Sequence, residues 1–409
     1  MYGSPTPESQ AVIDAGKQAF LQNYAPAPVV LDRGEGARVY DKDGNEYIDF
    51  GAGISVSSLG HQHPDLVAAA IDQLHKLWHV SNLYWTEPTA KLCEELAASC
   101  FAERVFLCNS GAEANEAAIK LARKWASATR DAEHREIITF EGGFHGRTIA
   151  TVTATAQPKY HEGFEPLPGG FTYCRFNDRA AIEAAMSERT AAVMVEPVQG
   201  EGGIHPAEPG FLEHLRKLCD RHDALLIADE IQCGMGRTGK LYAYQWSDIE
   251  PDIMTLAKAL GGGLPIGAML AGPKVAGCLQ PGSHGSTFGG NPVVCAVARV
   301  VLQKMQDRAL MQRVQTLSER VVTRLKKFGE ERQLFADVRA SGLLVGAQLR
   351  APFADKAGAV MSAGVDNGLL VLVAGSDVVR MLPPLTISDE ELNDGMDRLE
   401  ASFETALAD

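Results

Sequence analysis

The sequence has little of what marks membrane, secreted or nucleic-acid-binding proteins. No apolar run approaches the ~20 residues of a membrane span, and the first residues combine neither a basic region nor an apolar stretch of secretory length. Lysine and arginine number 38 against 52 aspartate and glutamate residues, a formal net charge of −14. Because acidic surfaces repel phosphate backbones and anionic lipids, we expect a soluble cytoplasmic protein that binds neither nucleic acid nor membrane.

The sequence also lacks any Cys-x-x-Cys pair among its eight cysteines. A chain of 409 residues does not need disulfides to close a core, so we expect buried thiols in a reducing compartment. Hydrophobic residues at 45% and charged residues at 22% exclude disordered, collagen-like and coiled-coil classes. Because a single core stops growing at roughly 250–300 residues, the length predicts two domains.

Residues 66–308 are predicted to form a large α/β domain. Short apolar runs alternate there with stretches of helical spacing. The runs lie at 105–107, 137–140, 192–195, 224–228, 253–256 and 266–271, and the helical stretches at 88–99, 112–127, 178–186, 209–222 and 292–306. Runs without strict alternation are typical of strands buried on both faces, which predicts a mainly parallel sheet with crossover helices.

Residues 309–409 are predicted to form a smaller α+β domain, which the N-terminal segment 1–65 joins. A helical stretch at 309–329 precedes strand-like runs at 343–349, 369–372 and 378–381, and a charged helix closes the chain. In the N-terminal segment, Asp43-Gly44 between two apolar-aromatic runs predicts a β-hairpin.

Two of the candidate site segments come after predicted strands. One offers a binding site for an anion, and the other offers a carboxylate. Ser110-Gly111 supplies a turn before an Ala-rich helix, whose free N–H groups and dipole suit a phosphate, although Asn109 or Ser110 could simply cap that helix. Asp229 follows the apolar run 224–228, where open α/β folds bind ligands, although a lone strand-end carboxylate is more often solvated.

Two further segments offer a lysine and an aromatic ring at the same sheet edge. Lys258 leaves a buried run and precedes three glycines, although most single lysines at such a place lie on the surface. Phe144 and Arg147 lie in a loop after the run 137–140, where an exposed arginine is usually solvated. Together the four segments predict a pyridoxal 5'-phosphate site, with the phosphate on a helix N-terminus, a lysine for the aldehyde, an aspartate for the pyridinium nitrogen and a stacking ring.

The chain resembles the class III (subgroup II) aminotransferases of the aspartate-aminotransferase fold, and within them the acetylornithine and succinylornithine branch. The resemblance extends over 24–384 and includes the motifs Asn-Ser-Gly-Ala-Glu-Ala-Asn-Glu-Ala, Phe-His-Gly-Arg-Thr, Glu-Pro-Val-Gln-Gly-Glu-Gly-Gly and Ala-Asp-Glu-Ile-Gln-Cys-Gly-Met-Gly-Arg-Thr-Gly. It implies a fold type I, pyridoxal-phosphate-dependent transferase.

The resemblance also implies roles for particular residues. Asp229 would pair with the ring nitrogen, and Lys258 would bind the aldehyde and act as the base of the 1,3-proton shift. The other cofactor-binding residues would be Ser110, Gly111 and Ala112 at the phosphate, Phe144 on the ring, Gln232 near the ring hydroxyl, and Thr287, which reaches the phosphate of the neighbouring subunit. The implied assembly is therefore a homodimer with shared active sites.

For the substrates, Arg147 and Arg380 suggest two carboxylate clamps, and Glu201 matches a glutamate that pairs with the second arginine. Tyr24 and Ser286 complete the expected substrate-binding set. The implied donor is N2-acetylornithine or N2-succinylornithine and the acceptor is 2-oxoglutarate, as in arginine biosynthesis, with the catabolic direction left open. Ornithine or 4-aminobutyrate is the alternative donor. Ser57 departs from the asparagine common among relatives, which leaves the acyl group open.

Three other interpretations are weaker. The sequence at 234–239 fits G-x-G-x-x-G, but no apolar helix follows it, as a dinucleotide-binding site requires. His61 and His63 lie in a Pro-containing loop without a matching cysteine or carboxylate cluster, so a structural role is favoured over metal binding. A non-enzymatic scaffold would lack one of the cofactor residues, and none is missing.

Overall fold

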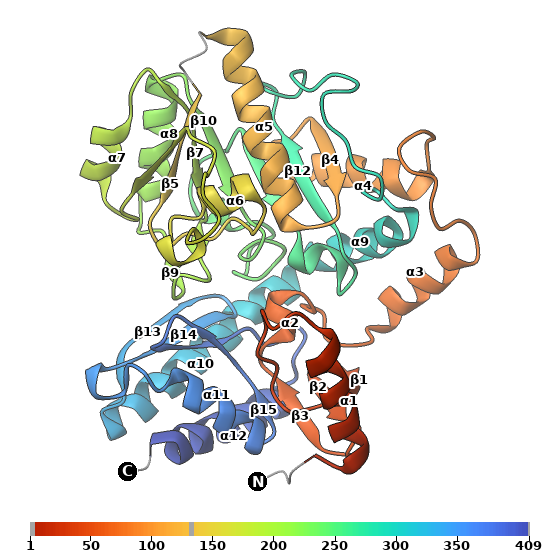
Figure 1. Ribbon diagram of the computed structural model, residues 1–409, viewed down its shortest axis with the longest axis vertical. Helices are drawn as coiled ribbons and strands as arrows, with labels where there is room; N and C mark the ends of the chain where they lie inside the picture. The colour runs from red at the N-terminus through yellow and green to blue at the C-terminus, as the bar shows by residue number, and fades with distance from the viewer. Residues whose placement is uncertain (1–4, 131–134, 408–409) are drawn as a thin grey trace. The chain divides into compact units, whose positions relative to one another are not determined.

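The computed structural model in Figure 1 describes residues 5–130 and 135–407, so the first four residues of the expected N-terminal segment lie outside it. The chain forms two compact units. One is Pro64–Gln315, and the other combines Met1–His63 with Thr316–Asp409.

The larger unit contains a seven-stranded sheet in the order β4-β12-β11-β10-β7-β5-β6. Its strands are β4 (Arg104–Cys108), β5 (Glu136–Phe140), β6 (Phe171–Cys174), β7 (Thr190–Val195), β10 (Leu225–Asp229), β11 (Ile253–Leu256) and β12 (Gly267–Ala271). The predicted α/β class and mainly parallel sheet are confirmed, but β12 runs antiparallel to both of its neighbours. The edge strand β6 was missed because it is short and only partly buried.

Helices cover both faces of this sheet. Adjacent residues of one strand enter opposite cores: Ile227 packs in a cluster with α5 (Gly111–Thr129), whereas Leu226 packs in a cluster with α8 (Phe211–Arg221). This explains the absence of alternation in the apolar runs. The other predicted helices correspond to α4 (Glu87–Ala98), α7 (Arg179–Ala185) and α9 (Pro292–Met305), while α3 (Pro64–Leu74) and α6 (Ile149–Ala154) were not predicted.

The smaller unit has two four-stranded sheets, ordered β1-β2-β3-β15 and β13-β14-β17-β16. The strands are β1 (Leu31–Glu35), β2 (Arg38–Asp41), β3 (Glu46–Asp49), β13 (Phe335–Ser341), β14 (Leu344–Leu349), β15 (Leu369–Leu370), β16 (Leu372–Ala374) and β17 (Val378–Met381). The hairpin at Asp43-Gly44 is confirmed, since β2 and β3 pair antiparallel across it. The run 369–372 was expected as one strand but divides between the sheets, since β15 pairs with β3 and β16 with β17.

Four longer helices belong wholly or partly to the smaller unit: α1 (Pro7–Ala19), α10 (Arg308–Arg332), α11 (Ala357–Asp366) and α12 (Asp389–Leu407). The chain passes from the larger unit to the smaller one within α10. The helix predicted at 309–329 and the closing charged helix are confirmed as α10 and α12, whereas α1 and α11 were not predicted.

All eight cysteines lie in the described part of the chain and are free. Five are buried, but Cys93, Cys100 and Cys278 are partly exposed, so the expectation of uniformly buried thiols was wrong for these three. Among the described residues, no helix has both the length and the apolar character needed to cross a membrane.

Candidate active site

The carboxyl ends of three neighbouring parallel strands, β5, β7 and β10, meet at one edge of the large sheet (Figure 1). Asp229 is the last residue of β10, Glu196 follows β7, and the loop that carries Phe144 and His145 follows β5. Open α/β sheets bind their ligands at this kind of edge, where loops leave adjacent strands together.

Asp229 is a buried carboxylate with both oxygens held. Its Oδ2 accepts a hydrogen bond from Nδ2 of Asn115 at 2.8 Å and lies 2.7 Å from Nδ1 of His145, while Oδ1 accepts from the N–H of Ile231 at 3.1 Å. Thr255 donates in turn to Oδ1 of Asn115 at 2.7 Å, which fixes the asparagine amide. The interpretation of Asp229 as a solvated strand end is therefore wrong, since it is only 3% exposed.

His145 supplies the charge opposite Asp229. Burial lowers the pKa of the imidazole, but the hydrogen bond and the negative charge of Asp229 outweigh that effect, so the pKa lies above its ordinary value. A protonated His145 stabilises Asp229 as an anion inside the protein. The backbone N–H of His145 donates to Oγ1 of Thr155 at 2.8 Å, which holds the loop in place.

Ser110 caps the start of α5, and backbone N–H groups at that start remain available as hydrogen-bond donors. Its hydroxyl accepts from the N–H of Glu113 at 3.2 Å, so the capping interpretation is correct. Since the first N–H groups of a helix have no partner within it, those of Gly111 and Ala112 remain available to an anion. A Cβ on Gly111 would lie 2.9 Å from the side chain of Ile231, two residues beyond Asp229. The anion site and Asp229 are therefore close together, and only glycine fits between them.

Phe144 and Arg147 lie beside the same edge. The Phe144 ring is half-buried and makes an edge contact with Tyr160, with ring centroids 5.9 Å apart. The guanidinium carbon of Arg147 lies 4.0 Å from the centroid of Tyr160 and 5.4 Å from that of Phe144. Arg147 is exposed, but these cation–π contacts hold it over the two rings.

Lys258 follows β11, whose Thr255 pairs in register with Asp229. It begins a short 3₁₀ turn, Lys258–Gly261, and is half-buried, so it is not the freely exposed lysine that the alternative interpretation required. Gly262 and Gly263 follow with φ of 57° and 121°, a region that favours glycine. Lys258 therefore lies three residues after Thr255, which is the neighbour of Asp229 on the adjacent strand.

Gln232 and Glu201 come from the adjoining loops. Gln232 is buried, and a Cβ on Gly200 would overlap its amide oxygen, so the loop before Glu201 passes directly against it. Glu201 is half-buried. These two residues therefore belong to the same part of the larger unit as Asp229.

Ser286 is held within its own chain. Its hydroxyl accepts from Nδ2 of Asn109 at 3.1 Å and from the N–H of Gly289 at 2.9 Å, next to the start of α5. The adjacent Thr287 is exposed.

The remaining predicted site residues, Tyr24 and Arg380, belong to the smaller unit together with Ser57. Arg380 is only 3% exposed within β17, and Tyr24 is exposed. His61, which was discounted as a metal ligand, belongs to the same unit. Its Nε2 lies 2.8 Å from Oδ2 of Asp49.

The glycine-rich stretch 234–239 of the larger unit forms turns, and the next helical element is the short 3₁₀ segment Ala243–Trp246. No α-helix follows the glycines, so the dinucleotide interpretation fails.

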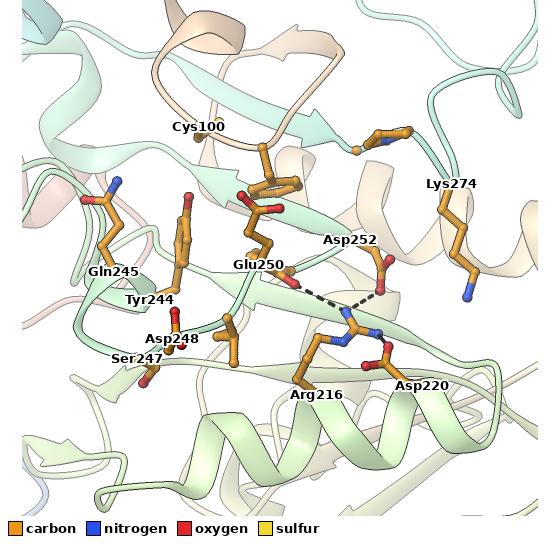
Figure 2. Close-up of a pocket in the computed structure, with 15 residues that line it drawn as sticks. Cys100, Arg216, Asp220, Tyr244, Gln245, Ser247, Asp248, Glu250, Asp252 and Lys274 are labelled. Atoms are coloured by element: carbon orange, nitrogen blue, oxygen red, sulfur yellow. Dashed lines mark hydrogen bonds and ion pairs between the residues drawn. The ribbon is translucent and has the colours of Figure 1, made fainter.

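Figure 2 shows a different cavity of about 940 Å³ at the opposite edge of the large sheet. Asp252 of this cavity precedes β11 and accepts from the N–H of Leu226 near the start of β10. Arg216 lies 2.7 Å from Asp252 and 2.8 Å from Asp220, so its charge is paired within the cavity. It is therefore separate from the edge that carries Asp229.

The family model for class-III aminotransferases matches residues 19–403 of this chain. The chain belongs to the class-III aminotransferases. It is 58% identical to the acetylornithine aminotransferase of Xanthomonas axonopodis pv. citri, over 93% of this chain and 94% of that protein. It is 48% identical to the succinylornithine transaminase of Yersinia pseudotuberculosis, over 98% and 97% respectively.

A solved structure shows the same fold. The N-acetylornithine aminotransferase from Stenotrophomonas maltophilia K279a superposes with a TM-score of 0.85 at 49% identity, covering 97% of this chain and 99% of the other. The predicted fold type I transferase is thus confirmed.

Class-III aminotransferases use pyridoxal 5'-phosphate, and the residues of this aminotransferase fit that cofactor. The free N–H groups at the start of α5, the carboxylate of Asp229 and the amine of Lys258 follow or end β4, β10 and β11, whose carboxyl ends lie at the same side of the sheet. Strands β10 and β11 are neighbours, and β12 lies between β11 and β4. His145, Asn115 and Thr255 were not predicted. His145 and Asn115 do occur in the motifs quoted for the family resemblance, which was the available signal.

Proposed function

We propose that this aminotransferase moves the side-chain amino group of N2-acetylornithine, or N2-succinylornithine, to 2-oxoglutarate, giving the N-acyl-glutamate semialdehyde and glutamate. The names of the two curated relatives support both acyl groups. The observation that carries the chemistry is the buried Asp229, held by His145 and Asn115 beside the strand that leads to Lys258.

The cofactor, when bound, supplies an electron sink that makes a proton next to the substrate nitrogen acidic. In this proposal Gly111 and Ala112 donate their N–H groups to its phosphate, together with Ser110. Asp229 would face the ring nitrogen and keep it protonated, Phe144 would stack on the ring, and Gln232 would lie near the ring hydroxyl. Lys258 would hold the aldehyde and would supply the base that moves a proton.

Two arginines would hold the substrates' carboxylates. Arg147 is preoriented by its cation–π contacts with the rings of Phe144 and Tyr160. Arg380 would hold the second carboxylate of 2-oxoglutarate, and Glu201 would neutralise it while the acyl-ornithine chain is bound. Tyr24 and Ser286 are proposed to contact the substrate.

An exposed apolar patch supports the proposed homodimer. Residues 77–85 expose Trp85 by 96%, Leu83 by 81% and Tyr84 by 72%, far more than large apolar side chains of a monomer usually show. Phe288, next to Thr287, is 62% exposed and its ring lies 5.1 Å from that of His79 in the same segment. In the proposed dimer this patch is covered by a second copy, and Thr287 reaches the partner's phosphate site.

The proposed function is tested by measuring the turnover of each amino-group donor separately with the cofactor-loaded protein. The donors are N2-acetylornithine, N2-succinylornithine, ornithine and 4-aminobutyrate, each with 2-oxoglutarate as acceptor. We expect kcat/KM to be highest for an acylated ornithine. A preference for ornithine or 4-aminobutyrate would contradict the proposal and favour the alternative donor.

Lys258→Ala is the matched control. We expect this variant to fold and to lose both turnover and the absorbance that arises when the lysine binds the aldehyde. Full turnover without added amine would show that another residue does this work.

A further inference from the structure

Glu196 is a buried carboxyl group to which the proposed reaction has so far given no part. It directly follows β7 and is only 6% exposed. Val195 pairs in register with Ala228, so Glu196 and Asp229 come next on two adjacent strands. A carboxyl group buried at this position needs compensating donors.

The donors come from the two loops that border the site. Oε1 of Glu196 accepts from the N–H of Phe144 at 2.8 Å, and Oε2 accepts from the N–H of Gly200 at 3.4 Å. One carboxyl group therefore ties the loop that presents the Phe144 ring to the loop that leads to Glu201.

The Phe144 loop needs such an anchor because it is rich in glycine. Gly142 and Gly146 have φ of 78° and 139°, so the loop backbone lies where few other residues are stable. At Gly143 a Cβ would lie 2.8 Å from the carbonyl oxygen of Phe140, 3.4 Å from Nε2 of His145 and 3.5 Å from Oε1 of Glu196. A Cβ there would clash with the Phe140 carbonyl oxygen, and it would be in van der Waals contact with Glu196, so the loop backbone passes close to the carboxyl group.

The titratable groups that face Glu196 are His145 in the loop after β5, and Asp229 and Cys233 at and after the end of β10. Burial and the negative charge of Asp229 raise the pKa of Glu196, while His145 and the two N–H groups oppose the rise, and the resulting pKa is about 7. A carboxyl oxygen accepts from the N–H of Phe144 in either protonation state, so the anchor persists through neutral pH.

We propose that Glu196 is a positioning residue, which sets the place of the Phe144 ring over the bound cofactor by holding the Phe144 N–H. This inference uses one part of the proposed function, namely that the cofactor lies against the Phe144 ring. The contact that matters is the single hydrogen bond to Oε1, so a side chain of the same length with an acceptor oxygen replaces Glu196, and a shorter one does not.

The test uses three variants of the full-length protein. Glu196→Gln keeps an oxygen at the same distance, Glu196→Asp keeps the acid but withdraws it by one methylene, and Glu196→Ala removes it. Glu230→Ala is the matched control, because Glu230 is also buried and accepts from the N–H groups of Ala243 and Tyr244, each at 2.6 Å, away from Phe144. The readouts are the Kd of pyridoxal phosphate for the apoprotein and the visible circular dichroism of the bound cofactor, which reports the asymmetry of its surroundings.

We expect Glu196→Gln to bind the cofactor within about 3-fold of the wild type and to keep its visible circular dichroism. Glu196→Asp and Glu196→Ala should raise Kd by about 10-fold, the effect of losing one well-placed hydrogen bond, and should weaken the dichroism. Glu230→Ala should lower thermal stability and leave both cofactor readouts unchanged.

Wild-type Kd and dichroism in Glu196→Asp would overturn the proposal, as would equal losses in Glu230→Ala. Should Glu196→Ala fail to fold, the comparison of the Gln and Asp variants decides. None of these readouts depends on the donor, so an absence of acyl-ornithine turnover would contradict the proposed function without changing the outcome here.

Discussion

Nδ1 of His145 lies 2.7 Å from Oδ2 of Asp229, and the two side chains are only 1% and 3% exposed. An ion pair this deeply buried is costly to assemble, and removal of either partner leaves an uncompensated charge. Its position at the ligand-binding edge of the sheet indicates a functional reason to keep it, since a buried anion is what a protonated ring nitrogen requires.

Asp229→Ala should therefore lower kcat by at least about 100-fold, because the ring nitrogen loses the anion that keeps it protonated. His145→Gln should have a smaller effect in the same direction, since Asn115 and the N–H of Ile231 still hold Asp229. Single-turnover rates of each half-reaction measure both effects. His161→Gln is the control for loss of a nearby imidazole, because the His161 ring lies against the backbone oxygens of Val152 and Thr155 and the ring of Tyr173. Near-normal rates in Asp229→Ala would show that the cofactor ring lies elsewhere.

Glu201 and Arg380 are proposed to let one pocket accept two unlike substrates. The acyl-ornithine donor carries a neutral chain next to its reacting amine, whereas 2-oxoglutarate carries a carboxylate there. Glu201→Ala should slow the half-reaction with the donor and spare the one with glutamate, and Arg380→Ala should mainly harm 2-oxoglutarate. Stopped-flow measurement of the two half-reactions checks this. Equal losses in both, for each variant, would mean an ordinary ion pair of little functional consequence.

Thr287 is expected to act across the dimer. When subunits carrying Thr287→Ala are mixed with subunits carrying Lys258→Ala, each heterodimer should contain one site with both defects and one with neither. The mixture should then recover about a quarter of wild-type activity, since random association makes half of the dimers mixed and one of their two sites intact. Sedimentation or light scattering confirms that dimers form. No activity beyond that of the unmixed Thr287 variant would place Thr287 and Lys258 in the same chain's site.

Glu230 predicts a pH dependence of stability. Burial raises its pKa from 4.5 to about 7, so between these values the folded protein holds a proton that the unfolded chain releases. The stability contributed by this proton is fully present below the unfolded pKa and is lost as pH rises through about 7. Relative to Glu230→Gln, the wild type should lose on the order of 2–3 kcal/mol of unfolding free energy between about pH 5 and pH 8.

Urea denaturation of the wild type and of Glu230→Gln at several pH values measures this difference. The exposed Glu208 supplies the control, because Glu208→Gln should not change the pH dependence. Parallel stability curves for the wild type and Glu230→Gln would contradict the raised pKa.

The large sheet could be predicted from sequence because its central strands are buried on both faces. The residues of β7 and β10 are apolar apart from Thr190 and Asp229, so each strand is visible as a continuous run. The edge strand β6 has partly exposed residues and lacks that signal. The run 369–372 is equally apolar throughout, and only the pairing of each half with a different sheet divides it.

Asp229 and Lys258 could be predicted because each directly follows such a run. The partners that fix Asp229 could not, since Asn115 is 114 residues away from it in sequence and His145 is 84 residues away. Glu196 follows its strand, whereas Asp229 ends one, and what distinguishes Glu196, a hydrogen bond to an N–H 52 residues away, exists only in the folded chain. Local patterns place the ends of elements, whereas tertiary pairing decides which side chains meet there.

The most direct measurement of the central claim is product formation from N2-acetylornithine and 2-oxoglutarate by the purified, cofactor-loaded protein. Mass spectrometry with the donor labelled by ¹⁵N at its side-chain amine follows the transferred nitrogen. The account predicts one labelled glutamate for each N-acetylglutamate semialdehyde formed, and neither product with Lys258→Ala. Unlabelled glutamate, or semialdehyde formed with release of free ammonia, would contradict an amino-group transfer by this protein.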